Sequence, residues 1–128
     1  MAEFSMSVDQ ENEFDETADF ISKTAKAAYE TLLWSEGVSE GSEIHKSVVV
    51  ELFIRVSDFL WSDTVRLYIE QYELSPEFVG HNFILSGNGH GAGFWDSGEY
   101  PNEVGQELHR QSTVIEMYAD DFGVYYVG

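Results

Sequence analysis

The pattern of apolar and polar positions in the first half of the chain predicts two helices. From about Asp19 to Ser35, apolar side chains and alanines recur at helical spacing, and the Gly-, Ser- and Glu-rich residues 35–43 end this helix. A longer pattern from about Lys46 to Tyr72 has apolar residues at three- and four-residue steps: Val49, Phe53, Val56, Leu60 and Leu67. We expect this second helix to supply much of the core, with a break near residues 61–63 as an alternative to one continuous helix.

The second half of the chain favours short strands around one more helix. Ser75-Pro76 is expected to end the second helix, and residues 81–85 are typical of a strand that returns at Phe94-Trp95. A third helix is expected from about Pro101 to Gln111, followed by strands at 113–118 and 124–127. The predicted fold is therefore α+β: two N-terminal helices, then hairpin, helix and hairpin, with an antiparallel sheet of about four strands.

The distribution of charge divides the chain into an arm and one domain. Residues 1–16 carry six carboxylates and no basic residue, so their mutual repulsion favours a flexible acidic arm. Residues 17–128 are expected to form a single domain.

Composition and charge exclude several classes of function. The 128 residues have a formal net charge of −18, from 24 acidic against 6 basic residues, which argues against direct binding to nucleic acid or to anionic membranes. The chain has no cysteine, so it has no disulfides, thiolate nucleophiles or cysteine-based zinc sites. No apolar run approaches the roughly 18 residues of a membrane span, and the N-terminus lacks the features of a secretion signal, so we expect a cytoplasmic protein.

A glycine-rich loop is the most unusual local feature of the sequence. Its candidate structural or ligand-binding residues are Gly87, Asn88, Gly89, His90, Gly91, Gly93, Trp95 and Asp96. Glycines at alternate positions allow positive φ angles or a close approach, but no Lys or Arg occurs from Leu67 to His109, so we do not expect a phosphate site.

The loop also offers candidate chemistry. His90 with Asp96 could form a base and its orienting carboxylate, and His81 with both could bind a metal through nitrogen and oxygen. Ser86 and Ser97 are the only candidate nucleophiles nearby. We therefore expect no enzyme, no catalytic residue, no cofactor and no metal, with His90 fixing the loop by hydrogen bonds.

One segment supports a resemblance to a known group of proteins. Residues 75–96, SPEFVGHNFILSGNGHGAGFWD, closely resemble a family of small phage and prophage proteins that share an NGHGAGFWD core. The match continues through residues 104–108 and 118–123, and faintly at 31–35, so about half of the chain is covered. Ser86 and Ser97 stand where family members often carry a basic residue. The resemblance implies a phage origin and supplies no mechanism.

Phage origin and charge together predict an acidic inhibitor of a host defence or nucleic-acid-processing enzyme. Such a protein would mimic DNA or otherwise occupy the basic surface of its partner, because duplex DNA presents one charge per roughly 1.7 Å of axis. Glu99, Glu103 and Glu107 would form a row on the third helix, with neighbours roughly 6 Å apart. The expected acidic face consists of Glu70, Glu73, Glu77, Glu99, Glu103 and Glu107. Restriction, CRISPR and recombination enzymes are all candidate targets.

Three alternatives stay open. The glycine-rich loop around His90 could bind a small molecule or a metal, which would make this a ligand-binding protein. The chain could instead be an adaptor of the phage particle or of its replication machinery, with charge serving solubility. A homodimer contact could form through exposed rings among Phe94, Trp95, Tyr125 and Tyr126.

Overall fold

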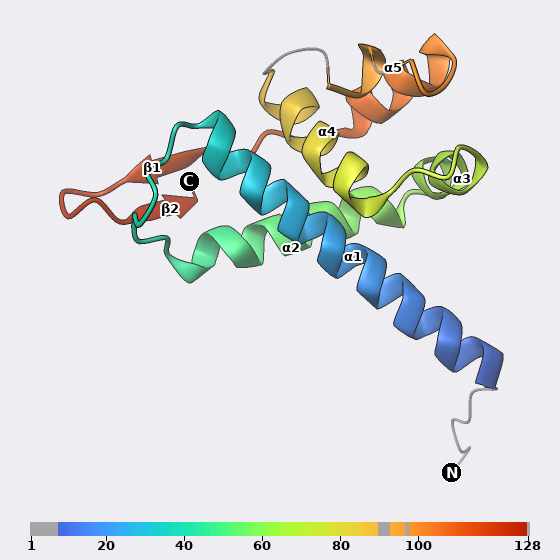
Figure 1. Ribbon diagram of the computed structural model, residues 1–128, viewed down its shortest axis with the longest axis horizontal. Helices are drawn as coiled ribbons and strands as arrows, with labels where there is room; N and C mark the ends of the chain where they lie inside the picture. The colour runs from blue at the N-terminus through green and yellow to red at the C-terminus, as the bar shows by residue number, and fades with distance from the viewer. Residues whose placement is uncertain (1–7, 90–92, 97, 128) are drawn as a thin grey trace.

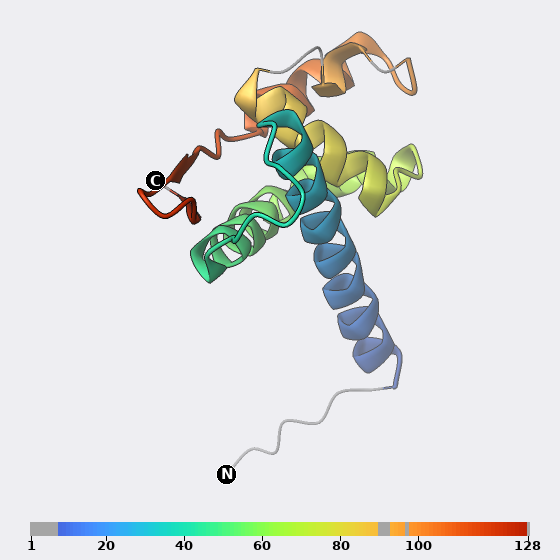
Figure 2. The same ribbon diagram turned by 60° about the vertical axis from the view of Figure 1, so that its left-hand side comes forward.

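The computed structural model describes residues 8–89, 93–96 and 98–127, and these residues form a helical body with a small hairpin at one side (Figure 1). In chain order the elements are α1 (Val8–Ser35), α2 (Lys46–Trp61), α3 (Asp63–Gln71), α4 (Pro76–Asn88), the 3-10 helix η1 (Gly93–Asp96), α5 (Asn102–Gln111), β1 (Met117–Ala119) and β2 (Tyr125–Val127). Figure 2 shows, as Figure 1 does, that the N-terminal half of α1 extends beyond the other helices.

The first helix begins earlier than the sequence pattern indicates. Residues 8–16 form the first turns of α1, whereas the pattern predicts a start near Asp19. The sequence places Asp9 and Glu11 at this end, where negative charge favours a helix because the N-terminus of the macrodipole is positive. The mobility of the 1–16 arm stays a prediction, and residues 1–7 lie outside the described part of the chain.

The prediction of an α+β fold with about four strands is wrong. The described residues are mostly helical, and their only sheet has two antiparallel strands. Residues 81–85 lie within α4, and Phe94-Trp95 lies in η1. The hydroxyl of Ser75 accepts a hydrogen bond from the Phe78 amide at 3.1 Å, and Pro76 occupies the first turn, so this pair begins a helix as well as ending the preceding turn. A short apolar run does not by itself separate a strand from a buried helix.

Helix α4 packs closely against α1 through a glycine. A Cβ on Gly80 would overlap the carbonyl oxygen of Thr24 and would lie 2.8 Å from both the Ala27 Cβ and the Ala28 amide nitrogen. Thr24 and Ala28 are fully buried at this crossing, and the Thr24 hydroxyl donates to the Phe20 carbonyl at 2.7 Å. A glycine in the middle of a helix costs stability, so its presence here reflects the close approach of the two backbones.

The long helical pattern from Lys46 to Tyr72 is divided at Ser62, as the alternative with a break predicts. Ser62 ends α2 and caps α3, and its hydroxyl accepts a hydrogen bond from the Val65 amide at 3.4 Å. The expected core face is partly wrong, since the buried residues of α2 are Val48, Leu52, Val56, Phe59 and Leu60. Four neighbouring apolar side chains of α2 are about half exposed instead: Val49, Val50, Phe53 and Ile54.

A cluster of aromatic rings joins the helices at the centre of the body. The fully buried Phe94 ring stacks on Phe59 with centroids 5.7 Å apart, and it meets the edge of Phe78 at 6.2 Å. Phe59 also packs against Phe83 at 4.9 Å. Phe94 is therefore part of the core of one chain, which removes it from the rings available for a homodimer contact.

The C-terminal hairpin agrees with the sequence analysis, although its strands are shorter than expected. Met117 pairs with Val127 and Ala119 with Tyr125 in the antiparallel register. The Asp120 carboxylate accepts hydrogen bonds from the amides of Val124 and Phe122 at 3.0 and 2.9 Å, and these bonds, the one from Val124 first, lower the pKa of Asp120 below its usual range.

Candidate functional site

The glycine-rich loop begins where α4 ends, and its first residues hold the C-terminal segment in place. Gly89 closes α4 in the left-handed conformation, with φ of 73°. A Cβ on Gly87 would overlap the Thr113 carbonyl oxygen. The Asn88 side chain accepts from the Ile115 amide and donates to the Ile115 carbonyl, both at 2.9 Å. Asn88 therefore pairs with Ile115 as a neighbouring strand would.

The last residues of the loop also pack closely against α4. Gly93 has φ of 57°, and a Cβ there would lie 2.7 Å from the Ser86 amide nitrogen. The Ser86 hydroxyl accepts a hydrogen bond from the Phe94 amide at 2.9 Å, in a fully buried position. Trp95 lies half exposed next to Phe94. His90, Gly91 and the side chain of Asp96 lie outside the described residues.

The remaining histidine of the metal alternative has other contacts. His81 Nδ1 lies 3.1 Å from the Thr31 hydroxyl, and the His81 ring is 6.2 Å from the Trp34 ring. Within residues 8–89, 93–96 and 98–127 no three His, Asp or Glu residues are grouped as metal ligands would be. Nothing in this described part favours a metal site at the loop.

An aromatic cluster joins the three segments of the chain that carry the predicted acidic residues. The Tyr100 ring packs at 6.0 Å against Tyr72 and at 6.2 Å against Phe78, and its hydroxyl donates to the Phe94 carbonyl at 2.6 Å. These contacts hold the segment before α5 beside the turn between α3 and α4. Five exposed glutamates lie within three positions of these rings in the sequence. We call them the acidic edge: Glu70, Glu73, Glu77, Glu99 and Glu103.

The row expected on the third helix is incomplete. Glu103 and Glu107 lie one turn apart on α5, whereas Glu99 precedes the helix, which begins at Asn102. Arg110 Nε donates to Glu107 Oε2 at 2.9 Å, and Gln111 donates to Glu107 Oε1 at 2.7 Å. The hydrogen bonds from Arg110 and then Gln111 lower the pKa of Glu107 to about 2. Glu107 is therefore engaged within its own helix, and it is not counted in the acidic edge.

The basic residues do little to offset this charge. Lys23 pairs with Asp19 at 2.9 Å and Arg55 with Glu51 at 2.7 Å, each one turn apart. Arg66 pairs with Asp63 in the first turn of α3. Most of the other described carboxylates are exposed, so the surface keeps a large excess of negative charge.

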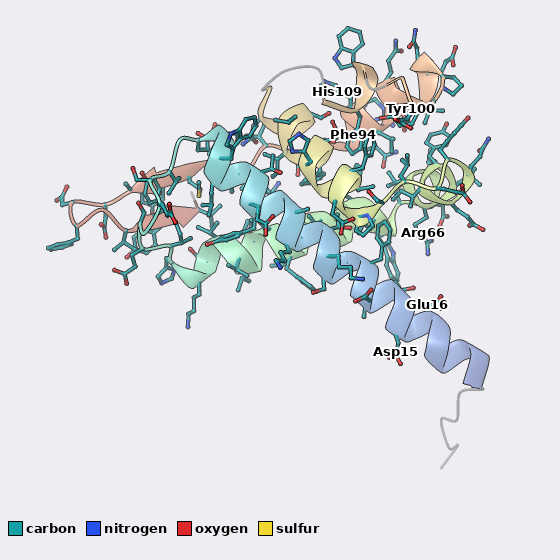
Figure 3. All side chains as sticks on the ribbon, in the orientation of Figure 1. Asp15, Glu16, Arg66, Phe94, Tyr100 and His109 are labelled. Atoms are coloured by element: carbon teal, nitrogen blue, oxygen red, sulfur yellow. The ribbon has the colours of Figure 1, made fainter. Side chains whose placement is uncertain are left out.

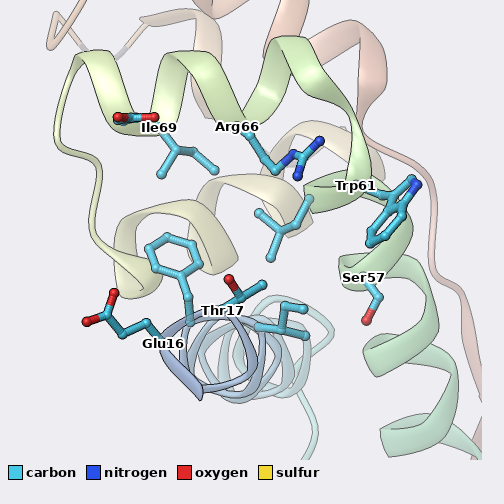
Figure 4. A pocket seen from close by; sticks show the side chains of 10 residues that line it. Glu16, Thr17, Ser57, Trp61, Arg66 and Ile69 are labelled. Atoms are coloured by element: carbon cyan, nitrogen blue, oxygen red, sulfur yellow. The ribbon is translucent and has the colours of Figure 1, made fainter. Parts of the chain in front are cut away.

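An apolar pocket lies between α1, the end of α2 and α3 (Figure 4). Its volume is about 270 Å³, and its apolar wall is formed by Phe20, Ile21, Leu60, Trp61 and Ile69. Its polar lining consists of Glu16, Thr17, Ser57, Arg66 and Glu70. Figure 3 shows that Glu16 and Arg66 belong to different parts of the chain, the projecting half of α1 and the helix above it.

Two features of the pocket rim define its chemistry. The Trp61 side chain is 77 % exposed, and the Arg66 guanidinium carbon lies 5.7 Å from the centre of its ring, at the distance of a cation–π contact. Glu70 joins the pocket to the acidic edge, because it belongs to both. The pocket thus places an exposed aromatic surface beside carboxylates.

The chain matches no protein-family model, no curated protein sequence and no solved structure. The resemblance to the phage and prophage family therefore stays a prediction. No helix in the described ranges combines the length and the apolar character that crossing a bilayer requires.

Sequence reasoning did not find the pocket. In the sequence, Phe20 is one apolar position of the first helical pattern, and Trp61 falls in the predicted break at residues 61–63. One signal was present: Trp61 immediately precedes the Ser62 cap, and a large apolar residue at a helix end often lies outside the buried face. Glu16 of α1 and Glu70 of α3 line the same pocket because both helices pack around the end of α2, an arrangement that no spacing along the chain reveals.

Proposed function

We propose that this protein is a phage-encoded acidic inhibitor that binds the basic surface of a host nucleic-acid-processing protein. The acidic edge occupies the place that nucleic acid would take. Its activity is binding, and it carries out no chemical step.

The observation that carries this proposal is the exposure of the carboxylates. Glu70 on α3, Glu73 in the turn that follows and Glu77 on α4 are all exposed. Glu99 precedes α5 and Glu103 lies in its first turn, and both are exposed. The Tyr100 ring between them packs against Tyr72 and Phe78 of the first group's segments. Burying such charges against another acidic or neutral surface would be unfavourable, because each would lose its hydration without gaining an opposite charge. A surface of lysines and arginines supplies that opposite charge.

The expected energetics resemble those of a protein that binds DNA. A basic cleft holds condensed or loosely bound anions, and release of these ions favours association with any dense anionic surface. The affinity should then fall steeply as salt concentration rises, and complementary fields should accelerate encounter.

The test begins with the protein immobilised and exposed to a nuclease-treated bacterial extract, followed by elution with rising salt. We expect a nucleic-acid-binding protein in the eluate, and we expect the free acidic protein to displace duplex DNA from it in a competition assay. An eluate without such a protein, or DNA binding that is unaffected by the competitor, would overturn the proposal.

A pair of matched variants separates the acidic edge from net charge alone. Glu70, Glu73 and Glu77 are changed together to Gln in one variant, and the exposed Glu30, Glu40 and Glu116 are changed to Gln in the other. Both variants lose three negative charges. We expect competition to weaken about tenfold or more in the first variant and by less than about threefold in the second.

A further inference from the structure

We infer that the pocket between α1, α2 and α3 receives one apolar side chain from a basic segment of the partner protein. The inference rests on the proposed function and deepens it, since it names the kind of partner segment that the acidic surface recognises: a large apolar residue flanked by lysines and arginines.

The size of the pocket fits a single side chain. Its volume of about 270 Å³ is just below the range of roughly 300–1,000 Å³ that is usual for small-molecule sites. Its lining includes the apolar side chains of Ile21, Leu60 and Ile69, so it favours an aliphatic or aromatic group over a polar ligand.

The charges around the pocket favour basic residues on either side of the partner's inserted apolar side chain. Glu16 of α1 and Glu70 of α3 both line the pocket, and Asp15 is exposed next to Glu16. The cation in the lining, Arg66, is paired with Asp63 and lies over Trp61, so its charge is already compensated. A segment that enters between Glu16 and Glu70 therefore meets net negative charge on both sides, and lysine or arginine beside the apolar residue complements it.

Trp61 gives the surface a further property of a protein-binding site. Its side chain is 77 % exposed in the free protein, so a large apolar surface is in contact with water. Tryptophan is enriched among the residues that contribute most of the binding free energy at protein interfaces. The ring lies at the pocket rim, where an inserted side chain would cover it. Binding would thus bury apolar area that the fold of this chain leaves open.

The experiment uses the full chain and two dye-labelled synthetic peptides of equal positive charge. The first has one tryptophan between clusters of lysine and arginine, and the second has serine in place of that tryptophan. Fluorescence anisotropy should show the tryptophan peptide binding about tenfold more tightly or better, because one large apolar side chain is removed from water. Equal affinity of the two peptides would overturn the inference.

Two tryptophan variants serve as a matched pair. Trp61→Ala removes the pocket rim, whereas Trp34→Ala removes a ring that is 71 % exposed and lies at the other end of α1. We expect the Trp61 variant to lose about tenfold of the affinity for the tryptophan peptide, and the Trp34 variant to lose less than about twofold. Equal losses in the two variants would overturn the inference, and the melting temperature of each variant shows that it is folded.

The outcomes distinguish this inference from the proposed function. If the Glu70, Glu73 and Glu77 variant weakens DNA competition but Trp61→Ala changes nothing, the pocket inference fails and the proposed function stands. If the two peptides have the same affinity and that affinity does not change with salt concentration, the proposed role of charge fails as well. Preference for the tryptophan peptide that is lost in Trp61→Ala and weakened by salt supports both.

Discussion

The Asn88 side chain links the end of α4 to the C-terminal segment by two hydrogen bonds. It satisfies the backbone amide and carbonyl of Ile115, and Ile115 is itself almost fully buried. The hydrogen bonds join the end of α4 to the segment before β1. Sequence reasoning included Asn88 among its loop candidates, but no spacing points to a partner 27 positions away.

Removing this side chain should destabilise the protein without affecting its net charge. We expect Asn88→Ala to lower the free energy of unfolding by about 1–3 kcal/mol, because two backbone groups of Ile115 lose their partners. Urea denaturation followed by circular dichroism measures the change. Gln106→Ala on the exposed face of α5 is the control and should change stability by no more than about 0.5 kcal/mol. Similar stabilities of the two variants would show that water replaces Asn88 at little cost.

At the scale of elements, local signals decided which predictions succeeded. The division of the Lys46–Tyr72 pattern at Ser62, the third helix and the C-terminal hairpin are confirmed. The sequence marks these places by a helix-capping serine, by Pro101 just before α5 and by Gly123 in the hairpin turn. The prediction of a strand at residues 81–85 is wrong. The apolar run within it is short, and such a run fits a helix buried against α1 as well as it fits a strand. Gly80, which the sequence analysis does not single out, allows the close crossing of α4 with α1.

The crossing of α1 and α4 makes a specific prediction for Gly80. In an exposed helix, Gly→Ala would stabilise by roughly 1 kcal/mol, but here a methyl group would overlap the Thr24 carbonyl oxygen. We therefore expect Gly80→Ala to destabilise by about 1–3 kcal/mol as the helices move apart. Thermal unfolding of this variant beside the wild type measures the sign. A melting temperature at or above that of the wild type would contradict so close a crossing.

At the scale of the whole molecule, negative charge opposes folding while the aromatic core favours it. The chain is 43 % hydrophobic and 15 % aromatic, which is enough for a core, and the rings of Phe59, Phe83 and Phe94 provide its centre. The packing of the helices against one another was not predictable, because the contacts that fix it join segments that are distant in the sequence. The same holds for the pocket, whose walls come from three helices.

Screening of this charge should stabilise the fold. Raising NaCl from about 0.01 M to about 0.15 M shortens the Debye length from about 30 Å to about 8 Å, which weakens repulsion among exposed carboxylates. We expect the melting temperature to rise by several degrees, equally in NaCl and KCl. The variant with Gln at positions 30, 40 and 116 should start higher at low salt and rise less. A melting temperature independent of salt would mean that the carboxylates are too far apart to repel.

Backbone hydrogen bonds of Tyr125 tie the C-terminal hairpin to the connection between α1 and α2. The His45 amide donates to the Tyr125 carbonyl at 2.8 Å, and the Tyr125 amide donates to the Glu43 carbonyl at 3.0 Å, so the last strand fastens the connection between the first two long helices. Two segments that are far apart along the chain then belong to one cooperative unit. Detachment of β2 would release both amides to solvent together, and their exchange with deuterium would report a single shared event.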